Sequence, residues 1–187
     1  MSAADQPAPL TDLTAFLAEF GEESDRAGAI VGGTYLDDLL RQLLVSAMVP
    51  QKTAVADLVG GEDKMERPLS SFASRIRATY CMGLISKSEY GDLQQIKAVR
   101  NRFAHAQHGC TFADPKVVKA CNAMTLPRHV TSMNVPPEGA ERNWFNLSVA
   151  LCAAAIGARI KNASANRAST PVDYDFSQLP KRNRAGA

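Results

Sequence analysis

The chain has 187 residues, 45% of them hydrophobic and 21% charged, so it is long enough to bury one sizeable core and short for two. Its 21 basic and 19 acidic side chains leave a formal net charge of +2, which excludes a surface built to coat nucleic acid. No stretch approaches the roughly 20 apolar residues of a membrane span, and no secretion signal is visible. We therefore expect a single-domain cytoplasmic protein without a membrane contact.

The first quarter of the chain predicts a leader and two helices. Residues 1–10 are small, polar and proline-containing, which is typical of a disordered segment. Apolar residues then recur at spacings of three and four, which predicts a short helix over 11–20. Ser24 can cap a longer helix that Pro50 stops. The glycine pair at 32–33 inside it predicts a kink or close packing against another helix, and we favour close packing.

The middle of the chain predicts three further helices. The first is short, near 53–58, and the second opens at Ser70 or Ser71. The third begins with a capping box, in which the side chains of Ser86 and Glu89 satisfy each other's free backbone amides. It should end at about residue 105, where the apolar spacing stops.

The last third predicts two more helices and a tail. Asp114 followed by Pro115 combines an N-cap with a proline at the first helical position. A loop framed by Pro127, Pro136 and Pro137 follows, and the most apolar helix then spans 141–161. Beyond it the composition turns polar, with apolar side chains only at alternating positions near the end. These side chains could add to a partner's surface or fold back on the bundle, but the composition favours a solvated tail.

These elements predict an all-α fold, because no stretch shows the two-residue alternation and hairpin turns of a sheet. We expect a single-domain helical bundle of about six to seven helices with disordered termini. The predicted boundaries are a leader over 1–10, a helical domain over 11–161 and a flexible tail over 162–187.

The most informative stretch is the helix end from Arg100 to His105. Asn101 and His105 are four residues apart and share a helix face, while Arg100 lies beside the apolar stripe. One interpretation is a ribonuclease site, in which Arg100 binds phosphate, His105 moves a proton and Asn101 orients both. The other is a structural polar network, which we favour because buried ion pairs have the same sequence pattern.

An acidic cluster offers partners for Arg100. Glu23, Asp25 and Arg26 open the long second helix, and Asp37 follows three turns later. Burying a guanidinium is costly unless it is paired, so we expect one of Glu23, Asp25 or Asp37 to pair with Arg100. The alternative is an ordinary solvated face with surface ion pairs.

Other kinds of site have no sequence support. The acidic residues lack metal-ligand spacing, and the four cysteines form no C-x-x-C pair, so no metal site is predicted. No glycine-rich loop follows a strand, and no serine or cysteine has a triad motif around it. We therefore predict no cofactor, no metal and no firm catalytic residue.

Three blocks taken together resemble one family. They are ESDRAGAIVGGTYLDDLLRQLL, then PLSSFASRIRATYCMGLISKSEYGDLQQIKAVRNRFAH, then FADPKVV. Their order and content, over roughly residues 11–161, resemble the mannitol operon repressor family of bacterial helical proteins. The resemblance implies a transcriptional regulator without a helix-turn-helix, whose target operon need not concern mannitol.

A shorter resemblance points elsewhere. The Arg-Asn-x-x-x-His ending is similar to the HEPN group of helical domains, some of which are ribonucleases of toxin and defence systems. That resemblance would place Arg100, Asn101 and His105 in a metal-independent active site and would require a dimer.

The two resemblances imply different partners. We predict a regulator that acts through a protein partner, such as a DNA-binding regulator, or through a second copy of itself. Its balanced charge and the lack of a groove-reading helix predict no specific binding to duplex DNA alone. RNA is a partner only under the ribonuclease alternative.

Overall fold

The computed structural model describes residue 20 and residues 23–60, 67–106 and 109–174. Within these ranges the chain forms seven helices and no strand, which confirms the all-α prediction. The predicted leader, all but the last residue of the predicted first helix, and the end of the tail lie outside the described residues. The helices are α2 (Asp25–Ala47), α3 (Lys52–Val59), α4 (Phe72–Cys81), α5 (Lys87–His105), α6 (Pro115–Ala123), α7 (Leu126–Thr131) and α8 (Glu141–Ala165).

The helix starts follow the predicted capping signals. The Ser86 hydroxyl accepts a hydrogen bond from the Glu89 amide, and the Glu89 carboxylate accepts one from the Ser86 amide, which completes the predicted capping box. The Asp114 carboxylate accepts from the Lys116 amide at 2.9 Å, with Pro115 in the first turn. Ser71 rather than Ser70 caps α4. Side-chain chemistry therefore sets where these helices begin.

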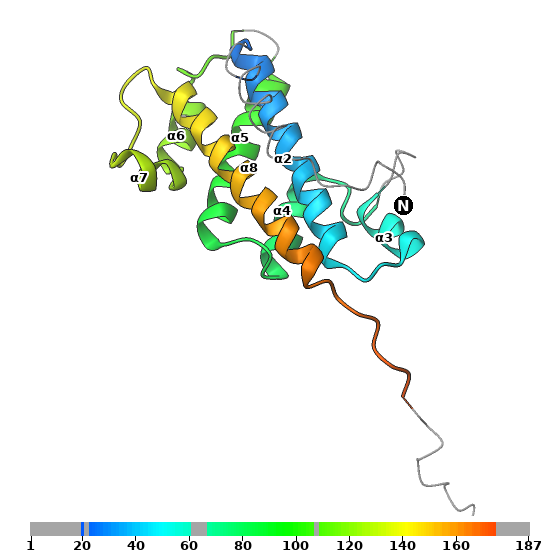
Figure 1. The fold of residues 1–187 in the computed structure, drawn as a ribbon. Helices are drawn as coiled ribbons and strands as arrows, with labels where there is room; N and C mark the ends of the chain where they lie inside the picture. Colours follow the sequence, from blue (N-terminus) through cyan, green and yellow to red (C-terminus); the bar gives the residue numbers. More distant parts are fainter. Residues whose placement is uncertain (1–19, 21–22, 61–66, 107–108, 175–187) are drawn as a thin grey trace, which may run out of the picture.

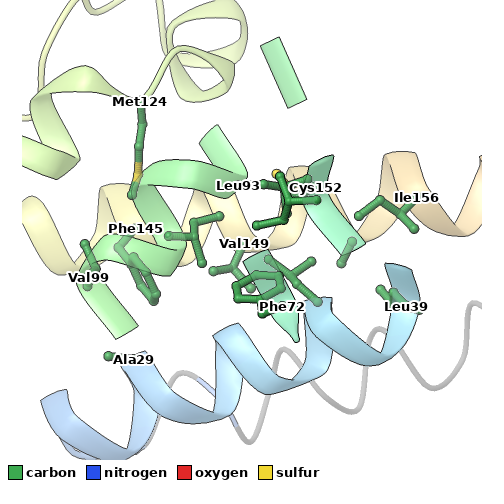
Figure 2. Packing of buried hydrophobic residues seen from close by; sticks show 14 of the residues in the cluster. Ala29, Leu39, Phe72, Leu93, Val99, Met124, Phe145, Val149, Cys152 and Ile156 are labelled. Carbon is green, nitrogen blue, oxygen red and sulfur yellow. The ribbon is translucent and has the colours of Figure 1, made fainter. Parts of the chain in front are cut away.

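The helices assemble around one shared core. α2 packs along α8 and also contacts α5 and α4, while α5 carries α6 on its other side (Figure 1). Figure 2 shows that α2, α5 and α8 point apolar side chains into the same volume. Among those labelled are Ala29 from α2, Leu93 and Val99 from α5, and Phe145 and Val149 from α8.

The glycine pair of α2 marks close packing, as predicted. A Cβ atom at Gly32 would lie 3.0 Å from the Phe20 ring and 3.3 Å from Val149. A Cβ atom at Gly33 would lie 2.8 Å from Cγ of Arg100 on α5. Since real Cβ atoms essentially never come that close to another side-chain carbon, only glycine admits α5 at this distance.

The loop predicted around Pro127 is wrong in one respect. Pro127 is buried in the first turn of the short helix α7. Proline is tolerated there because the first amides of a helix have no partner within that helix. The last helix also runs to Ala165, one turn beyond the predicted end at 161.

Candidate functional site

The C-terminal end of α5 carries the three residues that the sequence singled out. Asn101 and Arg100 are half-buried, and the Arg100 guanidinium donates to the Asn101 side-chain oxygen at 3.3 Å. His105 is the exposed last residue of the helix, one turn beyond Asn101. The arrangement holds Arg100 and Asn101 together and leaves His105 facing solvent.

Arg100 makes no ion pair with any described carboxylate. The expected direct pair with an acidic residue of α2 is therefore not formed within the described part of the chain. Asp37 is instead bound by Arg75, and the stem of Arg100 is spread over Gly33. Burial raises the pKa of Asp37, and the charge of Arg100 is one of the smaller effects that oppose this rise.

Arg75 is the residue that organises this cluster. It is only 9% exposed, and its guanidinium meets Asp37 of α2 at 2.7 Å. The same group donates to the backbone oxygens of Leu69 and Val59, which ties α2, α3 and the start of α4 together. Burial nevertheless raises the pKa of Asp37 overall, against the opposing effect of Arg75.

Sequence reasoning missed Arg75, although the helix period contained the signal. The buried residues of α4 are Phe72, Arg75, Ile76 and Thr79, so the arginine lies on the buried stripe at spacings of three and four. A charged residue in that position requires a partner from another helix.

The other predicted acidic residues lie at the start of α2. Asp25 meets the Arg142 guanidinium of α8 at 3.1 Å and accepts from the Phe112 amide at 3.3 Å. Arg142 also donates to the backbone oxygen of Glu23, and Arg26 donates to that of Ala106. This cluster fastens α2 to α8 and to the segment after α5.

The five residues predicted as one polar network thus occupy two places. Glu23 lies just before α2, and Asp25 and Arg26 lie in its first turn. Asp37, on which the charge of Arg100 acts, is about 18 Å further along the helix than Asp25. Both clusters link neighbouring helices through hydrogen bonds and ion pairs.

A second buried carboxylate, Asp92 of α5, was also missed. It is fully buried and accepts four hydrogen bonds: from the Thr125 amide and hydroxyl at 2.7 and 3.0 Å, the Leu126 amide at 3.0 Å and the Ser148 hydroxyl at 2.8 Å. No described cation pairs with it. Two of its four donors are the backbone amides of Thr125, just before α7, and of Leu126, the first residue of α7, where the helix dipole favours a carboxylate. Asp92 therefore fixes α7 against α5 and α8.

The connection from α7 to α8 exposes apolar side chains. Val130, Met133 and Val135 are 59%, 48% and 51% exposed within six residues. From 115 to 137 the chain contains no aspartate or glutamate. Three exposed apolar side chains this close together are suited to contact with another protein.

No group of three or more histidine, cysteine, aspartate or glutamate side chains in the described ranges is placed to hold a metal ion. None of the helices in the same ranges has the length and hydropathy needed to cross a membrane.

A family model described as mannitol repressor matches residues 28–160, which is most of the chain. The chain belongs to the mannitol repressor family. The matched range contains all of α3 to α7 and nearly all of α2 and α8, so family membership concerns the whole described bundle.

A solved structure supports the same fold. The chain is similar to the X-ray structure of the MtlR-HPr complex from Escherichia coli, with 19% identity and a TM-score of 0.55. The likeness covers 82% of this chain and 97% of that one. At this identity the likeness shows a shared fold. No curated protein matches the chain.

Neither finding supports the HEPN resemblance. Both point to the mannitol repressor family, and the geometry at the end of α5 adds no acid–base pair around His105, whose side chain makes no hydrogen bond to a described residue.

Proposed function

We propose that this chain is a bacterial transcriptional regulator of the mannitol repressor type that works in the cytoplasm through a protein partner. The observation that carries the proposal is the family match over residues 28–160. The relative with a solved structure is an MtlR in complex with HPr, which supports HPr as the first partner to test.

The described surface favours a protein partner over DNA. The charge is nearly balanced at +2, and the longest helices are built into the bundle core on one side, so none is presented as a groove reader. The exposed Val130, Met133 and Val135 offer apolar contacts that a phosphate backbone cannot use.

We also infer that the polar residues predicted from the sequence serve the architecture. Support comes from their partners: Asp25 reaches α8, Arg26 reaches the segment after α5, and Asp37 reaches α4. On this proposal Arg100, Asn101 and His105 are not catalytic. The helical domain would begin at about residue 11, as predicted, and end with α8 at Ala165 rather than at 161.

The test is a calorimetric titration of the purified chain with HPr from the same organism. We expect saturable binding with a dissociation constant of about 1 µM or lower, which corresponds to a binding free energy of about 8 kcal/mol or more in favour of the complex. The same chain should show no sequence-selective binding to duplex operator DNA that survives about 200 mM salt. No heat with HPr, together with salt-resistant selective DNA binding, would contradict the proposal.

A further inference from the structure

The outward face of α8 is unusual for a helix in contact with solvent. From Asn143 to Ala158 the helix contains no aspartate, glutamate, lysine, arginine or histidine over 16 residues. Half of that circumference faces away from the core, with Asn143, Ala154 and Ala158 exposed and Leu147 and Leu151 half-buried. The face is therefore uncharged and largely apolar along its length.

Other helices of the same bundle differ from α8. The outward side of α2 carries Arg26, Asp38 and Arg41, and that of α5 carries Lys87 and Arg102. Exposed helix faces normally hold such charges, whereas a helix that is apolar on every side is normally buried. In Figure 1, α8 runs along the near face of the bundle, and none of the other described helices lies in front of it.

We propose that this face of α8 is a dimer interface, on which α8 of a second copy packs in the antiparallel direction. Alanines at 150, 154 and 158 lie one turn apart and allow the two helix backbones to approach closely. A symmetric dimer needs a surface that is complementary to itself, and an uncharged face meets that need without repulsion.

Exposed charges near the two ends of α8 favour one orientation, since Arg142 is already paired with Asp25 and Arg159 with Glu89. Glu138 is exposed just before α8 begins, and Lys161 is exposed near its end. Antiparallel pairing brings Lys161 of one copy to the Glu138 end of the other. Parallel pairing would place Lys161 beside Lys161 and Glu138 beside Glu138, which is unfavourable. The helix dipoles also oppose each other only in the antiparallel arrangement.

The size of the face predicts a modest affinity. Sixteen helical residues extend over about 24 Å, so the contact is smaller than the roughly 800 Å² per partner of a standard interface. We therefore expect dissociation constants of about 1 to 100 µM rather than a permanent dimer.

Sedimentation equilibrium of the full chain tests the interface. Across about 1 to 200 µM, the average mass should rise from the 20.1 kDa of one chain towards twice that value. Ala154→Arg places a charge at the centre of the face and should hold the mass at one chain. The matched control, Ala98→Arg on the exposed side of α5, should dimerise like the wild type. A wild type that stays monomeric, or an Ala154→Arg variant that dimerises equally, would overturn the proposal.

Cysteine cross-linking tests the orientation in a Cys81→Ser background, because Cys81 is exposed. Ala154→Cys, close to the symmetry axis, should cross-link to itself. Lys161→Cys should not, yet it should cross-link to Asn143→Cys when the two variants are mixed. Self-cross-linking of Lys161→Cys as fast as that of Ala154→Cys would contradict the antiparallel arrangement. Neither experiment contains HPr, so a failure here leaves the proposed function standing.

Discussion

The two halves of α5 place polar side chains in opposite settings. In the N-terminal half, Asp92 is fully buried and accepts four hydrogen bonds from α7, the residue before it and α8. In the C-terminal half, Arg100 donates to its neighbour Asn101, and His105 is exposed. The half with the chemically suggestive motif is the less constrained one, while the half without a motif has the most closely surrounded polar group.

This difference helps to distinguish structural polar groups from catalytic ones. A catalytic group has to be held in place by its neighbours, usually through hydrogen bonds to a second group. In the described part of the chain that degree of organisation is found around Asp92 and Glu89, and the Glu89 carboxylate is bound by Arg159 at 2.9 Å. Both carboxylates connect α5 to α8, which is where a bundle needs polar cross-links. The motif at residues 100–105 has no such support.

The largest effect is expected at Asp92. Asp92→Ala leaves the Ser148 hydroxyl and the amides of Thr125 and Leu126 without an acceptor inside the protein. Each lost partner costs about 1 to 3 kcal/mol, so the free energy of unfolding should fall by at least about 3 kcal/mol in urea denaturation. The exposed Asp38→Ala should lower it by less than about 1 kcal/mol. Equal losses in the two variants would remove the contrast between the halves of α5.

The second-largest loss of stability is expected when Arg75 is replaced. Arg75→Met keeps the apolar stem but strands the half-buried Asp37 and two backbone oxygens, for a loss of about 2 to 3 kcal/mol. Since Asp37 then has no ion-pair partner, the double variant Arg75→Met with Asp37→Asn should recover part of the loss. Strictly additive losses in thermal or urea unfolding would show that the pair does not act as a unit.

The next largest change in the free energy of unfolding is expected where the stem of Arg100 packs on α2. Gly33→Ala forces a methyl group against the stem of Arg100 and should cost about 1 to 2 kcal/mol, despite the better helix propensity of alanine. Gly91→Ala in α5 meets nothing within 4 Å and should stabilise by about 0.5 to 1 kcal/mol.

Arg100→Ala in the Gly33→Ala background should restore stability, because it removes the clashing stem. If the double variant is no more stable than Gly33→Ala alone, the close approach of α5 to α2 at this point is not what glycine provides.

The smallest effect concerns two aspartates that pair with arginines. Burial raises the pKa of Asp37 above its usual value of 3.8, whereas the hydrogen bond from Arg102 lowers the pKa of Asp114 below it. The contribution of Asp37 to stability is therefore complete below pH 3.8 and is lost as pH rises through its folded pKa. That of Asp114 is present above pH 3.8 and is lost as pH falls through its folded pKa.

Carboxyl carbon chemical shifts followed by nuclear magnetic resonance should show Asp114 titrating at lower pH than Asp37. The reverse order would mean that burial does not dominate at Asp37.

The sequence predicted those parts of the fold that depend on local chemistry. The capping box at Ser86 and the Asp114-Pro115 start involve residues close together in the chain, so their spacing was sufficient. The close packing at the glycine pair was also predictable, although its partner, Arg100, was not.

The missed features depend on contacts between distant segments. Asp92 and Arg75 occupy core positions in their helices, and only the fold brings their partners close. The partners of Asp92 are 33 or more residues away in the sequence, and Asp37, the partner of Arg75, is 38 residues away. Pro127 was predicted in a loop because nothing near it in the chain indicates that Asp92 will cap the helix that contains it. For the same reason the sequence could predict that Arg100 needs a partner, but it could not predict that Asp37 would pair with Arg75 instead.

We propose that this chain acts by binding a protein and that the motif at the end of α5 is not catalytic. The most direct test incubates the wild type and His105→Ala with single-stranded RNA in the presence of a chelator. We expect no cleavage by either protein and unchanged melting temperatures, because His105 is exposed and has no described partner. Metal-independent cleavage by the wild type that falls about a hundredfold or more in an equally stable His105→Ala variant would contradict it.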